Sequence, residues 1–272
     1  MSRPLLSCAL AIGGLDPGGG AGVVADLRAF GAAKAFGCAV VALSTIQSTA
    51  GLDAAEPLAP KLLLAQARAV LKNQRVRAIK VGALGSEANV RAIGELLSAH
   101  RDIPAVVDPV MLPSRGRARL LAETALRALR TDLVRRSAVV TANIPEAEAL
   151  VRRRIISVPD ARDAARALVD LGARAALVKG GHLLGPRAVD VLAIGDEIIE
   201  VAAKRIRMRY TVHGGGCTLA SLIAGRLAVD ERNFDADGDD MIVDAVRFAK
   251  RVHHGMLASA RDVGGDMRVL VP

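Results

Sequence analysis

Aromatic residues are scarce in this 272-residue chain, which contains no tryptophan, one tyrosine and four phenylalanines. Proteins that bind single-stranded nucleic acids stack the bases on aromatic rings, and so few rings leave little material for such a platform. The net charge of +9 would suit a polyanion, but the basic residues are scattered, and their longest uninterrupted run is the three arginines at 152–154. We therefore expect no nucleic acid among the partners of this protein.

Cysteines and long apolar runs are also in short supply. Cys8, Cys38 and Cys217 are an odd number at irregular spacing without a C-x-x-C pair, which argues against a disulfide framework and against a zinc knuckle. Residues 5–8 are similar to a lipoprotein cleavage box, but too few apolar residues precede them for a signal peptide. No apolar stretch approaches the roughly 20 residues of a transmembrane helix. We expect a cytoplasmic protein that has no membrane segment.

The hydrophobic residues, 51% of the chain, form short runs that alternate with amphipathic segments of helical length. The expected strands cover residues 7–12, 39–45, 78–81, 105–110, 138–141, 175–178, 189–194 and 198–202. The expected helices cover residues 20–34, 60–71, 89–100, 122–129, 161–171, 218–226 and 240–259. Repeated strand–helix–strand units of this kind predict an α/β protein with a mostly parallel sheet and helices on both faces.

Neither a linker nor a repeat divides the chain, so residues 1–272 are expected to form a single domain. Ligands of open α/β sheets bind beyond the carboxyl ends of the strands. The residues that follow each expected strand are therefore the candidates for a functional site.

The first candidate is the glycine-rich segment 13–22, between the strand at 7–12 and the following helix. Glycines let the backbone approach a ligand closely, and the start of a helix favours negative charge. The spacing is neither G-x-G-x-x-G nor that of a P-loop. A merely flexible turn remains the alternative for this segment.

The second candidate is the run Gly214, Gly215 and Gly216 before Cys217. Successive glycines at a helix start direct several backbone N–H groups to one point, which makes an anion-binding concavity. Cys217 lies in the first helical turn, where the dipole should favour its thiolate and suit it as a general base or nucleophile. The alternative is a buried cysteine on an ordinary helix.

The third candidate joins polar residues near the ends of three strands. Asp108 and Glu146, the latter in the series Asn143-x-x-Glu146, could together hold Mg²⁺ through water, as phosphate chemistry requires. Lys179 follows the strand at 175–178 and is a plausible phosphate or nucleotide contact. Glu146 could instead serve its own helix dipole, and a lone lysine is usually solvated.

Taken in order, these segments resemble the hydroxymethylpyrimidine/phosphomethylpyrimidine kinase family. The segments that carry the resemblance are residues 12–27, 107–112, 143–147, 179–183 and 213–219. The resemblance implies a ribokinase-like three-layer α/β/α domain around a mostly parallel central sheet. It also implies ATP-dependent phosphorylation of 4-amino-5-hydroxymethyl-2-methylpyrimidine, and then of its monophosphate, in thiamine biosynthesis.

The resemblance also implies a role for each site residue. It places the pyrimidine among Gly14, Asp26 and Gln47, and Mg²⁺ at Asp108 and Glu146. It places the nucleotide beside Asn143, Lys179, His213 and Thr218. An anion hole is implied at Gly214, Gly215 and Gly216, and the base for the attacking hydroxymethyl group at Cys217. ATP and Mg²⁺ are the implied cofactors. The positive net charge would draw in ATP by long-range steering.

Two alternatives stay open at this point. A pyridoxal kinase of the same family acts on a similar ring with a hydroxymethyl group. A weakly active ligand-binding relative is the second alternative, because the family usually has Thr at the position of Gly215 and Met at that of Ala83. The expected partners are a small-molecule substrate and a second copy of the chain in a homodimer, which the helix at 240–259 could support.

Overall fold

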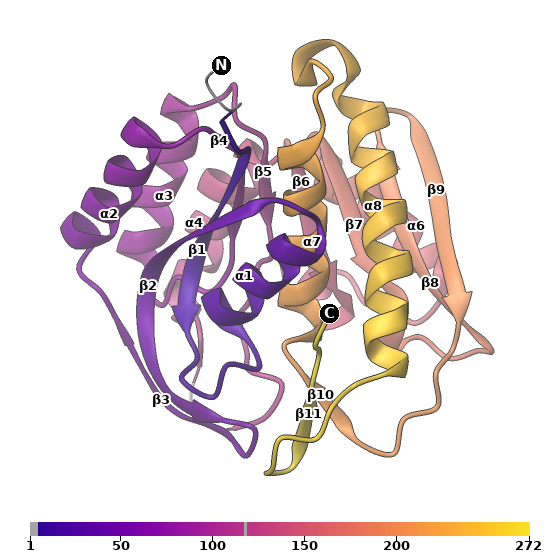
Figure 1. The fold of residues 1–272 in the computed structure, drawn as a ribbon. Coiled ribbons are helices and arrows are strands. Elements are labelled where there is room, and N and C mark those ends of the chain that lie inside the picture. Colours follow the sequence, from indigo (N-terminus) through magenta and orange to yellow (C-terminus); the bar gives the residue numbers. More distant parts are fainter. Residues whose placement is uncertain (1–4, 117–118) are drawn as a thin grey trace.

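The computed structural model describes residues 5–116 and 119–272, and within them nine strands form one sheet (Figure 1). The strands are β1 (Cys8–Leu15), β2 (Phe36–Ser48), β3 (Gly51–Pro57), β4 (Val76–Val81), β5 (Ala105–Val107), β6 (Val139–Asn143), β7 (Ala175–Lys179), β8 (Arg187–Ile194) and β9 (Glu197–Lys204). Their order across the sheet is β3-β2-β1-β4-β5-β6-β7-β8-β9. All neighbours from β2 to β7 are parallel, and β3, β8 and β9 pair antiparallel. The expected mostly parallel sheet is confirmed.

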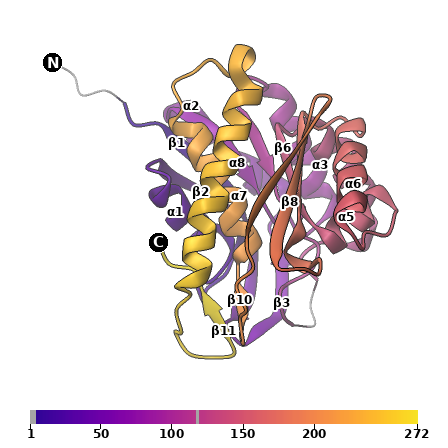
Figure 2. The same ribbon diagram turned by 90° about the vertical axis from the view of Figure 1, so that its right-hand side faces the viewer.

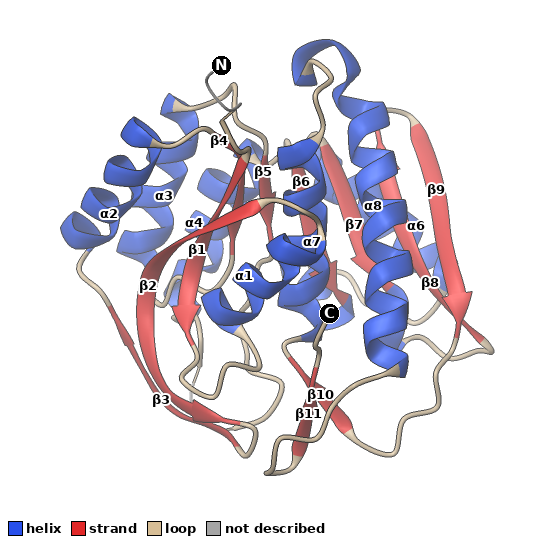
Figure 3. Cartoon of the chain, in the orientation of Figure 1, coloured by secondary structure: helices blue, strands red, loops and turns tan. Residues whose placement is uncertain are grey.

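Helices cover both faces of the sheet and make three layers, which Figures 2 and 3 show from two directions. One face carries α1 (Gly22–Ala32), α7 (Gly215–Val229) and α8 (Phe234–Ala258). The other face carries α2 (Pro60–Asn73), α3 (Glu87–Ala99), α4 (Leu126–Ala128), α5 (Ile144–Val151) and α6 (Val158–Asp170). A separate parallel pair, β10 (Thr211–His213) and β11 (Met267–Val269), joins the end of the chain to the segment before α7.

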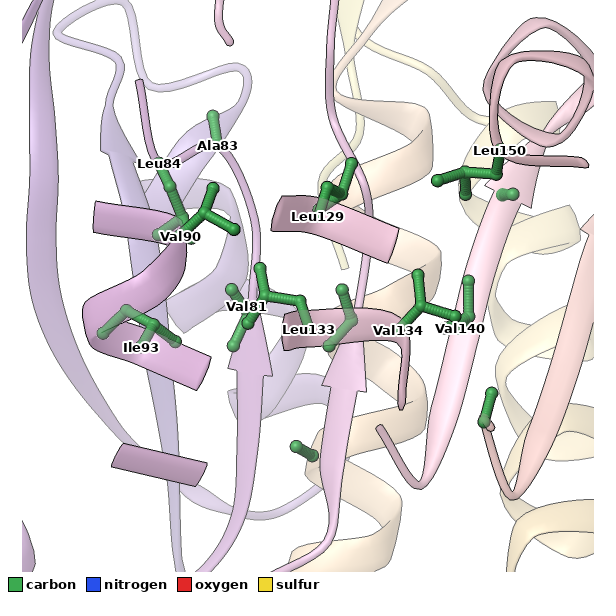
Figure 4. Packing of buried hydrophobic residues seen from close by; sticks show 14 of the residues in the cluster. Val81, Ala83, Leu84, Val90, Ile93, Leu129, Leu133, Val134, Val140 and Leu150 are labelled. Carbon is green, nitrogen blue, oxygen red and sulfur yellow. The ribbon is translucent and has the colours of Figure 1, made fainter. Parts of the chain in front are cut away.

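The alternation of side chains along a buried strand divides the core in two. Leu10 and Ile12 of β1 belong to the cluster under α2, α3, α5 and α6, whereas Ala9 and Ala11 belong to the cluster under α1 and α7. Figure 4 shows part of the first cluster, where Ile93 and Leu133 pack around the end of β4. Both faces are apolar, so the strands read as continuous hydrophobic runs in the sequence.

Parallel strands place their carboxyl ends at one edge of the sheet, and two helices meet at that edge. Helix α7 begins there, after β10, and α8 ends there, before β11 (Figure 1). Every residue of α7 from Thr218 to Gly225 is buried, so the sheet and α1 hold this helix firmly. Helix α7 is therefore held firmly from Thr218 onward, and its first residues lie beside the strand ends.

Several elements differ from the expectations, and the short strands β10 and β11 are among those that were not expected. Strand β3 was not expected, because its sequence is short of β-branched and aromatic residues. It is the edge strand of the sheet and pairs with the second half of β2. A helix that begins near Glu146, as one interpretation of that residue implied, is present as α5. The helix expected at 122–129 is a series of 3₁₀, α and π turns from Glu123 to Arg136. Among the described residues, no helix has the length and apolarity needed to cross a membrane.

Candidate active site

The start of α7, the expected anion-binding concavity, lies at the carboxyl edge of the sheet. Gly214 is the N-cap residue and has a φ of +74°, and a Cβ there would collide with the carbonyl oxygen of Gly20. A Cβ on Gly216 would lie 3.3 Å from Lys179 Nζ and 3.7 Å from Asp108 Oδ2. The first N–H groups of a helix have no acceptor within it. Here these N–H groups lie beside Lys179 and Asp108, and the N–H groups together with the lysine could bind a phosphate.

The register of β5, β6 and β7 brings three of the expected site residues to the same edge. Asn143 is the direct partner of Lys179 across β6 and β7, and Asp108 follows the last residue of β5. Lys179 Nζ donates a hydrogen bond to Asp108 Oδ1 at 2.8 Å and lies 3.8 Å from Glu146 Oε2. One ammonium group thus lies against two buried carboxylates.

The pKa values in this cluster reflect burial and charge. Burial raises the pKa of Glu146 to about 7, with a further rise from Asp108 and an opposite effect from Lys179. Burial alone would lower the pKa of Lys179, but Asp108 and Glu146 raise it above its usual range. Lys179 is therefore a permanent cation, and a second cation near Glu146 would favour its ionised form.

Glu146 also serves the helix that it begins. Its Oε2 accepts a hydrogen bond from the Asn143 N–H at 2.8 Å, and Asn143 Oδ1 accepts one from the Glu146 N–H at 2.9 Å. This is a capping box at the start of α5. The interpretation of Glu146 as a residue that serves its own helix is therefore confirmed, and its role toward Mg²⁺ stays a prediction.

Asp108 and Glu146 fit Mg²⁺ as two carboxylate ligands that phosphate oxygens and water would complete. The described residues contain no cluster of three or more His, Cys, Asp or Glu side chains that could enclose a metal ion. Mg²⁺ is usually bound by one or two carboxylates together with phosphate oxygens and water. Asp108 and Glu146 supply such a pair beside the concavity of α7.

A second buried ion pair lies under the expected pyrimidine site. Lys80 Nζ donates to both carboxylate oxygens of Asp26 at 2.9 Å, and Ser221 Oγ donates to Asp26 Oδ1 at 2.7 Å. Asp26 and Lys80 are at most 1% exposed. A Cβ on Gly82 would lie only 2.8 Å from Lys80 Nζ. The resemblance placed Asp26 at the pyrimidine, but the structure encloses its carboxylate in this pair.

Cys217 is influenced by both ion pairs, and its acidity differs from the expectation. Burial raises the pKa of the Cys217 thiol to about 12, Lys80 and Lys179 act to lower it, and the carboxylates of Asp108 and Asp26 act to raise it. The expectation that the helix start would favour the thiolate is wrong for the ligand-free chain. The loss of hydration is the largest of these effects.

The glycine-rich loop is held by Asp16, which the sequence reasoning missed. Its carboxylate accepts hydrogen bonds from the Gly18 and Ala21 N–H groups at 2.8 Å and contacts His213 Nε2 at 2.8 Å. Burial would raise the pKa of Asp16, but the bond from His213 and those from the backbone lower it. The loop is therefore an ordered structure and not a flexible turn. An acidic residue within a glycine run was the available signal for it.

Gln47 joins the same network from β2. Its Oε1 accepts a hydrogen bond from Thr45 Oγ1 at 3.2 Å, and its Nε2 lies 3.5 Å from His213 Nε2. Gln47 is half-buried, and Gly14 lies on the neighbouring strand against Leu43. The amide of Gln47 is thus held in position at the carboxyl edge.

Two residues expected at the nucleotide have enclosed side chains. His213 is 2% exposed and packs on Gly20, where a Cβ would collide with its ring. Thr218 is 4% exposed, and its Oγ1 donates to the Gly214 carbonyl at 2.9 Å. His213 therefore ties the glycine-rich loop to β10, and Thr218 stabilises the N-cap turn of α7. Neither side chain is accessible for direct contact with a nucleotide.

Comparison with known proteins shows the family of this chain. The family model described as phosphomethylpyrimidine kinase matches residues 16–265. The chain is 41% identical over 258 residues to a hydroxymethylpyrimidine/phosphomethylpyrimidine kinase of Streptomyces coelicolor, across 95% of this chain and 91% of that protein.

Two solved structures are similar over nearly the whole chain. A phosphomethylpyrimidine kinase of Clostridium difficile has a TM-score of 0.77 and 32% identity, with 92% of this chain and 99% of that chain covered. A pyridoxal kinase of Staphylococcus aureus, in complex with AMP-PCP and pyridoxal, has a TM-score of 0.85 and 26% identity, with 98% and 93% covered.

Proposed function

This chain belongs to the phosphomethylpyrimidine kinase family, and we propose that it transfers phosphate from ATP to 4-amino-5-hydroxymethyl-2-methylpyrimidine and then to its monophosphate in thiamine biosynthesis. The observation that carries the proposal is the meeting of the α7 concavity, the Asp108–Lys179 pair and Cys217 at one edge of the sheet. Phosphoryl transfer needs positioning and charge stabilisation more than covalent chemistry. The site supplies both.

The phosphate chain of ATP is proposed to lie at the start of α7. The backbone N–H groups of Gly215 and Gly216 would stabilise charge on the transferred group, and Lys179 would add a cation 3.3 Å from the Cβ position of Gly216. Mg²⁺ held through Asp108 and Glu146 would neutralise charge on the phosphates. Asn143, the strand partner of Lys179, borders the same region.

The pyrimidine is proposed to lie between the glycine-rich loop and Gln47, with its hydroxymethyl group toward Cys217. Gln47 presents an amide that can recognise ring nitrogens or an amino group by hydrogen bonds. Cys217 is protonated in the ligand-free chain, because burial keeps its pKa high. It would orient the attacking hydroxyl. To act as the general base it would first release its own proton to solvent, and the thiolate would then take the proton of the hydroxyl as the bond to phosphorus forms and the bond to ADP breaks. Asp26 and Lys80 would hold this wall of the site rigid from below.

Pyridoxal is the second candidate substrate. It also carries a hydroxymethyl group on a heteroaromatic ring, and the Staphylococcus aureus structure is a pyridoxal kinase. Ala83, which is 9% exposed, has a smaller side chain than the Met that the family usually has at this position, so it leaves more room for the ring of the substrate. Identity to the pyrimidine kinases is higher, at 32–41%, than the 26% to that pyridoxal kinase, and favours the pyrimidine.

The test is a steady-state assay of ADP release by the pure protein with Mg²⁺-ATP. The candidate acceptors are hydroxymethylpyrimidine, its monophosphate, pyridoxal and pyridoxamine. We expect the highest kcat/KM with the pyrimidine and further turnover of its monophosphate. The matched control is Gly216→Val, whose side chain would press on Lys179 and close the concavity. ADP release at background rate with every acceptor would refute the kinase assignment.

A homodimer of this chain remains a prediction of the sequence. Light scattering on the eluate of a size-exclusion column tests it directly. A mass near twice 28.3 kDa is the expected result.

A further inference from the structure

Gln47 is half-buried and therefore accessible to a ligand, whereas the Asp26 carboxylate expected beside it is enclosed. A glutamine amide has a donor end, Nε2, and an acceptor end, Oε1. The two ends have nearly the same shape, so the hydrogen bonds around the amide decide which end lies where. The neighbours of Gln47 therefore determine what a substrate meets at this position.

Thr45, two residues before Gln47 on β2, is the neighbour on one side. Its Oγ1 lies 2.8 Å from the Leu15 carbonyl oxygen and 3.2 Å from the Gln47 amide. A hydroxyl group has a single hydrogen to donate and two lone pairs with which to accept. The Leu15 carbonyl can only accept and makes the shorter contact, so it takes the hydrogen. Thr45 then presents a lone pair to Gln47, and a lone pair needs the donor end of the amide, Nε2.

His213 indicates the same orientation from the other side of the amide. Its Nε2 lies 2.8 Å from Asp16 Oδ2 and 3.5 Å from the Gln47 amide. Both oxygens of Asp16 already accept hydrogen bonds from backbone N–H groups, so the carboxylate is an acceptor and the hydrogen between it and the imidazole belongs to His213 Nε2. An N–H group repels the hydrogens of an amide NH₂ and attracts an amide oxygen. The end of Gln47 beside His213 should therefore be Oε1.

The two neighbours of the amide are themselves held in place. The Leu15 carbonyl of β1 holds the Thr45 hydroxyl, and Asp16 of the glycine-rich loop holds the His213 ring, which is only 2% exposed. Neither group can turn to suit a different ligand without losing its own hydrogen bond. The orientation of Gln47 is thus imposed by the fold, because both contacts come from strands and loops that the tertiary structure brings together.

We propose that Thr45 is a specificity-determining residue, which together with His213 holds the Gln47 amide with Nε2 toward Thr45 and Oε1 toward His213. Each end of the amide then keeps one position for a ligand, an N–H and an oxygen lone pair. This donor beside an acceptor matches a ring with an unprotonated nitrogen beside an amino group, as in 4-amino-5-hydroxymethyl-2-methylpyrimidine. The inference rests on the proposed function, because it takes this pyrimidine as the ligand of Gln47.

A fixed amide discriminates against rings in which the two groups are exchanged. In the 4-oxo analogue of the pyrimidine, a carbonyl replaces the amino group and the adjacent ring nitrogen carries a hydrogen, so donor and acceptor change places. An amide that turned freely would bind either ring, whereas a fixed amide meets the analogue with donor against donor. The hydroxymethyl group, directed toward Cys217, keeps the ring itself from turning over. Selectivity between the two rings therefore reports the orientation of Gln47.

Two substitutions of Thr45 separate this role from packing. Thr45→Val keeps the shape of the side chain but removes the lone pair, and Thr45→Ser keeps the hydroxyl group. The matched control is Ser44→Ala. Ser44 is exposed and comes directly before Thr45 on β2, where successive side chains point to opposite faces.

The experiment is calorimetric titration of the wild type and the three variants, without nucleotide, with the 4-amino pyrimidine and with its 4-oxo analogue. We expect the wild type to bind the 4-amino ring at least about 10-fold more tightly, because the analogue leaves the amide of Gln47 without partners. Thr45→Val should reduce this ratio at least about threefold, through weaker binding of the 4-amino ring. Thr45→Ser and Ser44→Ala should keep the wild-type ratio.

Other results would contradict defined claims. A wild-type ratio in Thr45→Val would overturn the role of Thr45, and so would an equal loss of affinity for both rings, which a packing defect produces. A wild type that binds the two rings equally, yet releases ADP with them, would overturn the fixed amide and leave the kinase function standing. A wild type that selects the 4-amino ring but phosphorylates none of the acceptors would overturn the proposed function and leave the role of Thr45 standing. A wild type that binds neither ring would overturn both.

Discussion

Lys179 Nζ lies 2.8 Å from Asp108 Oδ1, and this ion pair stands directly beside Gly216 at the start of α7. Asp108 is 2% exposed, so its charge depends on the lysine for compensation. The same ammonium group is available to a phosphate at the helix start. The pair thus serves the stability of the fold and the candidate site together.

Lys179→Met should reduce both stability and activity. It leaves the Asp108 carboxylate buried without a counter-charge, and such a loss costs about 3–5 kcal/mol of unfolding free energy. The kcat for phosphoryl transfer should fall by at least about 10²-fold, because one stabilising donor is lost from the phosphate site. Urea unfolding and the ADP-release assay measure the two effects.

The control for this prediction is the double variant Asp108→Asn, Lys179→Met. Removing both charges should restore much of the stability while activity stays low. A double variant that is less stable than Lys179→Met would show that the charge of Asp108 is compensated elsewhere.

The Cys217 thiol should resist deprotonation in the ligand-free, metal-free protein. Because burial raises its pKa to about 12, the thiolate fraction rises with pH throughout the accessible range. In a Cys8→Ser, Cys38→Ser background with chelator present, the rate of alkylation by iodoacetamide should increase about tenfold per pH unit from pH 7 to 10. A rate that reaches a plateau by pH 9 would contradict the raised pKa.

Cys217→Ala should lower kcat by at least about 10²-fold, the smaller end of the effect of losing a general acid–base group. The affinity for AMP-PCP should change little, since the backbone N–H groups of the helix start remain. Calorimetry and the ADP-release assay together separate binding from turnover. Unchanged kcat would remove Cys217 from the mechanism.

Two adjacent glycines should respond in opposite ways to alanine. Gly214→Ala should destabilise the protein by about 1–3 kcal/mol, because its φ of +74° and the Gly20 carbonyl exclude a Cβ. Gly215→Ala should be neutral or stabilising by up to about 1 kcal/mol, since its Cβ fits and alanine restricts the unfolded chain. Thermal unfolding of the two variants, side by side, measures the difference. Equal destabilisation by both would mean that a Cβ does not fit at position 215.

Much of the fold could be predicted from short-range patterns. The strands β1, β4, β6 and β7 lie within two or three residues of their expected positions, because buried parallel strands are continuous apolar runs. Strand β3 escaped prediction, because its pairing with β2 and not its own composition keeps it extended. The irregular turns from Glu123 to Arg136 were not predicted for a similar reason, because their packing against α3 determines their conformation.

The chemistry of the site could be predicted less completely than its location. Asp108, Asn143 and Lys179 meet as expected, because parallel register aligns the ends of β5, β6 and β7. Asp26 and His213, expected at ligands, are paired with Lys80 and Asp16. The distances along the chain are 54 and 197 residues, and no local pattern reports a pairing over such separations.

The sequence by itself determined the α/β architecture, the glycine turns and the edge of the sheet at which the site lies. These depend on the spacing of apolar residues and on the backbone freedom of glycine, which are local properties. Only the tertiary structure decided which charges are paired and that burial raises the pKa of the Cys217 thiol. Charge pairing and acidity depend on burial and on distances through space, and both arise only when the distant segments have packed together.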